Sequence, residues 1–184
     1  EHMQMGMLGS LYVTPRQDGQ SFTYGGKTYT KFAYNDGDGS TGYDADYPIQ
    51  LSSFDSVFHD KHLAVQPLPF AKMRDDYAMI NGRGYPDTVN PGPLDPPASA
   101  DNGGKDWSAD PAHPGPQVVS SLITASPNQR ILLRLSNVSV TTFFTGQSSG
   151  IPMKVVGMNA RLLRGPDIPV LGSYFGGTFC IKLN

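Results

Sequence analysis

Two side chains that can bind a metal ion open the sequence. The first seven residues are Glu-His-Met-Gln-Met-Gly-Met, so that His2 and Met7 stand five positions apart with Gly6 directly before the methionine. A type 1 copper centre needs two histidines and one cysteine thiolate in a trigonal arrangement, with a weakly bound axial methionine. We therefore interpret His2 and Met7 as the closing half of a copper-binding loop.

The other ligands of such a centre do not stand beside these two residues. A cysteine commonly opens the loop that the histidine and the methionine close, but the only cysteine in the sequence is Cys180, near the opposite end. The chain alone therefore cannot complete the site. The alternative is a structural role, because methionine often fills hydrophobic cores. A His and a Met five apart also occur by chance, and on spacing alone the structural role is favoured.

Two further groups of residues have metal-ligand chemistry. His59 and His62 would share one face of a helix and could hold a metal together, although two surface histidines are the favoured interpretation. The segment 36–46 carries side chains with oxygen ligands at alternate positions, as calcium loops do. Its sixth position is Thr41, where an EF-hand has glycine, and no glutamate closes it. An acidic, solvated turn is therefore the better interpretation.

Composition limits the class of protein. Charged residues make up 16% of the 184 residues, and there are 21 glycines and 16 prolines. Soluble proteins average about 25% charged residues, so this profile favours a loop-rich β protein over a helix bundle. The net charge is −2, and no basic stretch is long enough to follow a nucleic acid backbone. We also expect no membrane span, because no apolar run has the required length. With one cysteine, an internal disulfide framework is excluded.

Short alternating segments separated by Gly, Pro and Asn predict an all-β sandwich or barrel. One helix is expected over residues 55–66, with Val57, Phe58 and Leu63 on its buried side. The pair Asn81-Gly82 predicts a tight turn. Strands are expected over residues 7–13, over two segments within 21–34, and over 47–54, 78–80, 118–124, 130–137, 140–144, 153–156 and 160–163.

A Pro-rich stretch over residues 85–117 interrupts this pattern. Its eight prolines exclude a continuous helix or a central strand, so we predict a long surface loop. Loops of this length inside a domain are usually functional or disordered. Trp107 lies within it and predicts either an anchor for a partner or a contact with its own domain.

Three segments together resemble the multicopper oxidase family, in its bacterial three-domain form. The opening His2–Gly9 resembles the end of a cupredoxin copper loop. Residues 80–86, Ile-Asn-Gly-Arg-Gly-Tyr-Pro, resemble the turn that opens a core strand of the second cupredoxin domain. Residues 130–137, Arg-Ile-Leu-Leu-Arg-Leu-Ser-Asn, followed by 151–157 and 161–164, resemble the later strands of that domain.

The resemblance implies a fold and a domain arrangement. Residues 1–13 would be the C-terminal tail of a preceding cupredoxin domain, and residues 14–184 would form a second one. The fold would be an all-β, cupredoxin-like Greek-key sandwich with an N-terminal arm and the long Pro-rich loop. Because Glu1-His2 is not a natural start, we expect that an N-terminal part was removed or that the sequence belongs to a longer protein.

The resemblance also implies a function for the parent protein. It would be a copper-dependent oxidoreductase that couples substrate oxidation to dioxygen reduction, with His2 as a type 1 copper ligand and Met7 as the axial ligand. Its partners would be the remaining cupredoxin domains or other copies of the chain. Its location would be periplasmic, outer-membrane-associated or extracellular in a bacterium. This chain alone would be inactive.

The sequence also departs from the family pattern, and the departures favour a second hypothesis. The four histidines form no His-x-His pair, which the family uses to hold a trinuclear copper cluster, and the last residues fit the pattern poorly. The chain could therefore be a metal-free structural or assembly module, such as a surface or filament subunit on a cupredoxin scaffold. A domain that normally lies between two others exposes apolar surface when they are missing, so the apolar arm residues Met3, Met5, Met7 and Leu8, together with the loop around Trp107, predict contact with another chain or another copy.

Overall fold

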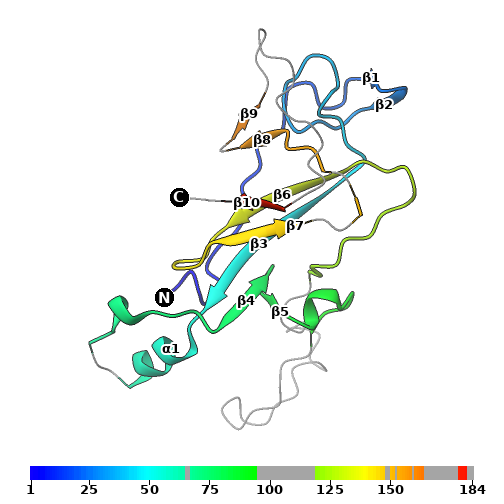
Figure 1. Ribbon diagram of the computed structural model, residues 1–184. Coiled ribbons are helices and arrows are strands. Elements are labelled where there is room, and N and C mark those ends of the chain that lie inside the picture. The colour runs from blue at the N-terminus through cyan, green and yellow to red at the C-terminus, as the bar shows by residue number, and fades with distance from the viewer. Residues whose placement is uncertain are drawn as a thin grey trace, which may run out of the picture. The chain divides into compact units, whose positions relative to one another are not determined.

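The structure is a computed structural model, and it is rich in β-strands (Figure 1). It describes residues 1–64, 67–94, 119–147, 150–151, 153–158, 160–163 and 178–181. Among these residues there are ten short strands, one α-helix and two single-turn 3-10 helices. The β-rich class expected from composition and patterning is therefore confirmed. Within the same residues, no helix has the length and apolar character to cross a membrane.

The chain divides into two compact units. Unit 1 comprises residues 1–8, 48–124 and 135–142, and unit 2 comprises residues 9–47, 125–134 and 143–184. Each unit is therefore assembled from segments that lie far apart in the sequence. The N-terminal residues 1–8 belong to unit 1, whereas residues 9–13 belong to unit 2.

The largest sheet among the described residues has four strands. It contains β3 (Ala45–Phe54), β4 (Tyr77–Ile80), β5 (Arg83–Gly84) and β6 (Ile131–Asn137), in the order β5-β4-β3-β6 (Figure 1). Strands β3 and β4 are antiparallel, from Leu51 opposite Ile80 to Phe54 opposite Tyr77. The predicted turn at Asn81-Gly82 joins β4 to β5, and both of its residues have positive φ, 52° and 78°. Asparagine and glycine tolerate this conformation best.

Helix α1 (Ser56–Leu63) follows β3 directly, as predicted. The side chain of Asp55 caps it by accepting the Phe58 N–H at 2.8 Å, which satisfies a donor that the first helical turn leaves free. Phe58 is the buried apolar residue of the helix, with 1% exposure. The prediction that Val57 and Leu63 share its buried side is wrong, because they are 54% and 80% exposed. At eight residues, the helix is anchored by one aromatic side chain and its cap.

Arg83 organises the beginning of the Pro-rich stretch. Its side chain is fully buried and donates to the carbonyls of Asn90 and Gly92, each at 2.7 Å. The 3-10 helix η2 (Asp87–Val89) lies in the segment between Arg83 and the two carbonyls that its guanidinium binds. From the other end of the stretch, the Ser120 hydroxyl donates to the Asn90 carbonyl at 2.6 Å. In these contacts, side chains supply the hydrogen bonds that a neighbouring strand would supply through its backbone. The strand predicted over residues 118–124 does not form in its described part, 119–124.

A second 3-10 helix, η1 (Phe70–Lys72), lies before β4 in unit 1. Its Phe70 ring packs against the Phe58 ring of α1, with 5.1 Å between the centroids. This contact brings the segment after α1 back toward the helix.

Unit 2 is built around a short hairpin and three aromatic side chains. Strands β1 (Phe22–Tyr24) and β2 (Lys27–Tyr29) pair antiparallel across the turn at residues 25–26. The Phe32 ring meets the Phe22 ring edge to face, with 5.3 Å between the centroids. Phe32, Tyr29 and Tyr43 are buried, with exposures of 0%, 5% and 7%. In the described part of unit 2, the buried apolar side chains are all aromatic.

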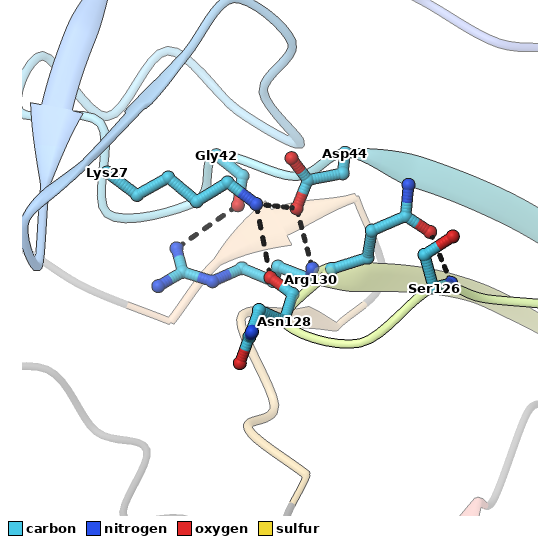
Figure 2. A network of polar contacts seen from close by, with 7 residues as sticks. Lys27, Gly42, Asp44, Ser126, Asn128 and Arg130 are labelled. Carbon is cyan, nitrogen blue, oxygen red and sulfur yellow. Dashed lines mark hydrogen bonds and ion pairs between the residues drawn. The ribbon is translucent and has the colours of Figure 1, made fainter.

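A polar network joins the hairpin of unit 2 to the segment before β6 (Figure 2). The Asp44 carboxylate accepts the Lys27 ammonium at 2.8 Å and the Arg130 N–H at 2.6 Å. The Arg130 guanidinium donates to the Gly42 carbonyl at 3.1 Å and lies over the Tyr29 ring, 4.7 Å from its centroid. Burial alone would raise the pKa of Asp44, but the hydrogen bonds from Lys27 and Arg130 outweigh it, and the net shift is downward.

The later strands of unit 2 form two small pairs. Strand β7 (Phe144–Gln147) pairs antiparallel with β10 (Thr178–Ile181), and β8 (Gly157–Met158) pairs with β9 (Arg161–Leu162). The strand predicted over residues 140–144 begins only at its last residue, and the one predicted over 153–156 does not form. The strand predicted over residues 7–13 does not form either. Leu11 and Val13 are instead 94% and 87% exposed in irregular backbone.

Removing the Phe32 ring should destabilise the protein. Phe32 is completely buried, and Phe→Ala substitutions in cores cost about 3–5 kcal/mol because they leave a cavity. Phe32→Ala should therefore lower the free energy of unfolding by about 3 kcal/mol, measured by urea denaturation followed by tyrosine fluorescence. Phe143→Ala is the matched control, because Phe143 is 66% exposed; equal losses in both variants would contradict this assignment of the core.

Candidate metal-binding loop

The first seven residues fold into consecutive turns that bring His2 and Met7 together. The Met5 N–H donates to the Glu1 carbonyl at 3.1 Å, and the Met7 N–H donates to the His2 carbonyl at 3.0 Å. Gly6 has a φ of +88°, a conformation that L residues with a Cβ rarely adopt. The sequence thus places glycine where the chain must reverse before Met7. We call residues 1–7 the N-terminal loop.

Both predicted ligand side chains of the N-terminal loop face solvent. Met7 is 70% exposed, and His2 is also exposed. Within the described part of the chain, the His2 imidazole makes no hydrogen bond or ion pair, so both of its ring nitrogens are accessible. Met3 and Met5 are exposed as well, at 45% and 64%. In the part of the chain that the structure describes, these methionines therefore do not fill a core.

Gln4 is the one residue of the N-terminal loop whose side chain is buried, with 7% exposure. Its amide nitrogen donates to Asp75 Oδ1 at 2.9 Å. Its amide oxygen faces His59 Nε2 at 2.9 Å and also accepts the Asp55 N–H at 3.5 Å. A polar side chain therefore fastens the loop to unit 1, while its apolar neighbours point outward.

The Asp75 carboxylate receives donors from three separate segments of unit 1. Its Oδ1 accepts from Gln4, and its Oδ2 accepts from the hydroxyls of Ser53 at 2.6 Å and Thr142 at 2.7 Å, and from that of Thr141. Burial alone would raise the pKa of Asp75, but these hydrogen bonds outweigh it and hold the pKa below its ordinary value of 3.8. The carboxylate is therefore held in its ionised form.

His59 and His62 both contact the N-terminal loop. His62 Nε2 lies 2.9 Å from the Glu1 carboxylate, and His59 holds Gln4. The His59 ring also stacks on the Phe54 ring, with 4.4 Å between centroids and 6° between planes. Burial lowers the pKa of His59 below its ordinary value of 6.5. The shared helical face predicted for the two histidines is therefore present, and it serves as a clamp on residues 1–4.

The residues of the N-terminal loop fit part of a copper site. A neutral imidazole and a thioether are ligands that copper accepts, and both are accessible on one closed turn. Among the described residues, no group of three or more His, Cys, Asp or Glu side chains could hold a metal ion. Cys180 lies in β10, and its side chain is outside the described part. His2 and Met7 would thus form a two-ligand half-site.

The acidic segment 36–46 is an internally hydrogen-bonded turn. The Asp36 carboxylate accepts the N–H groups of Asp38, Gly39 and Thr41, the Thr41 hydroxyl and the Gln17 side-chain amide, at 2.5–3.1 Å. Burial would raise the pKa of Asp36, but these bonds produce a net lowering. This carboxylate has five protein donors, which supports the interpretation as a structural turn. Trp107 and His113 lie outside the described residues.

Sequence reasoning missed Gln4, Asp75 and Glu1 as parts of this site. Only Gln4 stood out in the sequence as a residue with a separate role, because it is a single amide within a run of methionines. Asp75 offered none, because it stands 71 positions away in the sequence and its partners are common hydroxyl residues. Comparison of the chain with family profiles, with curated proteins and with solved structures finds no match.

Neutralising Asp75 should lower the free energy of unfolding of the protein, mainly above pH 4. Because the folded-state pKa lies below 3.8, the ionised group contributes stability that is fully present above the unfolded pKa. This contribution is lost as pH falls through the folded pKa. We expect Asp75→Asn to reduce the free energy of unfolding at pH 7 by about 1–2 kcal/mol, and to reduce it less at pH 3. Urea denaturation at both pH values measures this, with Asp60→Asn on exposed helix surface as the control; an equal loss at pH 3 and pH 7 would contradict the assignment.

Proposed function

We propose that this chain is part of a multicopper oxidase and that its N-terminal loop supplies two ligands of a type 1 copper site. The observation that carries the proposal is the turn closed by the Met7 N–H and the His2 carbonyl. It holds an imidazole and a thioether, the two ligand types that type 1 copper takes from such a loop, on one short loop with both side chains exposed. The resemblance of residues 80–86 and 130–137 to the same family supports the proposal independently.

In the proposed site, each residue of the loop has a defined task. His2 offers a ring nitrogen as a strong ligand, and Met7 offers a thioether as a weak axial ligand that tunes the reduction potential. Gly6 permits the reversal that brings Met7 back toward His2. The cysteine thiolate and the second histidine would come from the preceding part of the parent protein. When bound, type 1 copper supplies one-electron transfer.

The proposal extends to the fold and to the partners. Residues 1–13 would belong to a preceding cupredoxin domain and residues 14–184 to a second, with a Greek-key sandwich as the architecture. The β-rich class and the antiparallel pairing of β3 with β4 are consistent with that architecture. The exposed methionines 3, 5 and 7 would be covered by neighbouring domains or another copy. A periplasmic, outer-membrane-associated or extracellular bacterial location belongs to the same proposal.

A second candidate function has its own supporting observation. Leu11 and Val13 are almost fully exposed in a segment without strand structure, and exposed apolar segments are typical of interaction sites. The chain would then be a metal-free structural or assembly module. The two candidates differ in one measurable property, which is whether the N-terminal loop binds copper.

A copper titration tests the proposed function. The chain should bind one Cu(I) with a shift of the Met7 methyl and His2 ring NMR signals, because both ligands lie on one accessible turn. His2→Ala and Met7→Leu should each weaken binding about tenfold or more. Met158→Leu, which replaces another exposed methionine, should not.

The same sample should show no oxidase activity toward phenols or metal ions, since the site holds two ligands. Binding that is unchanged in both His2→Ala and Met7→Leu would contradict the proposal and leave the assembly module as the better candidate.

A further inference from the structure

In the N-terminal loop a polar side chain is buried and apolar side chains are exposed, which is the reverse of the usual pattern. Gln4, a polar residue, is 7% exposed, while its apolar neighbours Met3 and Met5 are 45% and 64% exposed. Burying an amide costs free energy unless its donors and acceptor find partners. The burial of Gln4 is therefore explained by its specific contacts, and these contacts determine how the loop lies.

The contacts fix the orientation of the Gln4 amide. A carboxylate can only accept hydrogen bonds, so the amide nitrogen must face Asp75 Oδ1, at 2.9 Å. The amide oxygen then faces His59, whose Nε2 must carry the proton to donate across 2.9 Å. Both partners are themselves fixed: the His59 ring stacks on Phe54, and Asp75 accepts three hydroxyl groups.

The Gln4 anchor stands midway between the two predicted ligands. His2 is two positions before it and Met7 is three positions after it. The contact between the Glu1 carboxylate and His62 Nε2, at 2.9 Å, adds a second attachment to α1 at the start of the loop. A ligand loop that is held before the metal arrives loses less conformational entropy on binding, so its affinity is higher.

We propose that Gln4 is a positioning residue that ties the His2–Met7 turn to His59 and Asp75 of unit 1. This inference rests on the proposed function as regards copper, but the anchoring itself does not. Under this proposal, residues in the middle of the chain determine how the N-terminal loop presents its two metal ligands. The matched prediction is that loss of the Gln4 amide loosens the turn and weakens copper binding without unfolding the protein.

The first experiment measures the anchoring without metal. Hydrogen exchange by NMR on the full 184-residue chain reports the Met5 and Met7 amides, which are bonded to Glu1 and His2. Gln4→Ala should lower their protection about fivefold to tenfold, the equivalent of one typical hydrogen bond. Gln20→Ala, a change at an exposed glutamine, should leave both amides unchanged. His59→Ala should reproduce part of the effect, and adding it to Gln4→Ala should cause little further loss, because both remove the same contact.

The second experiment measures what the anchoring does for the metal. Cu(I) affinity from competition titrations should fall about fivefold in Gln4→Ala, while the urea midpoint of the Phe32 core stays close to that of the unmodified chain. Unchanged protection of the Met5 and Met7 amides in Gln4→Ala would overturn the inference. Reduced protection in a chain that binds no Cu(I) would sustain the anchor and reject the proposed function, so the two failures are distinguishable.

Discussion

The Asp75 carboxylate is the contact on which the arrangement of unit 1 depends. It accepts donors from residues as far away as Gln4, 71 positions earlier, and Thr142, 67 positions later. Few apolar side chains are available to do this work, because in unit 1 the described residues bury only Ile49 and Phe58. Hydrogen bonds to a charged group are stronger than those between neutral groups. A single carboxylate can therefore hold the N-terminal loop, β3 and the segment after β6 in one place.

Unit 2 uses the same physical solution around different residues. Asp44 joins the hairpin to the segment before β6, and Asp36 closes its own turn (Figure 2 shows the Asp44 network). In both cases a carboxylate whose pKa is lowered replaces part of the apolar packing that a larger core would provide. The chain was expected to be loop-rich from its glycine and proline content. Loops lack the backbone hydrogen bonds that join neighbouring strands, so their N–H groups need side-chain acceptors such as these carboxylates.

Short sequence patterns predicted local structure, but they could not predict contacts between residues far apart in the sequence. The helix after Asp55, the Asn81-Gly82 turn and β6 follow from short-range signals in the sequence. The structure adds the Asp55 cap to the helix and shows positive φ at both turn residues. The strand predicted over residues 7–13 does not form, and the one predicted over 118–124 does not form in its described part, 119–124. An extended segment becomes a strand only where a partner strand satisfies its backbone groups. His2 and Met7 could be selected from their chemistry. The contacts of Gln4 could not be predicted, because they exist only once residues 55, 59 and 75 are folded beside it.

One buried amide docks the N-terminal loop on unit 1, and the loop presents an imidazole and a thioether to solvent. The most direct test of this docking is a nuclear Overhauser measurement on the Gln4 side-chain amide protons of the isotopically labelled chain. A docked loop predicts two well-resolved amide protons with cross-peaks to the His59 ring and to the Asp75 β protons, because these two residues are the direct partners of the amide. Averaged, random-coil amide shifts without those cross-peaks would contradict this docking.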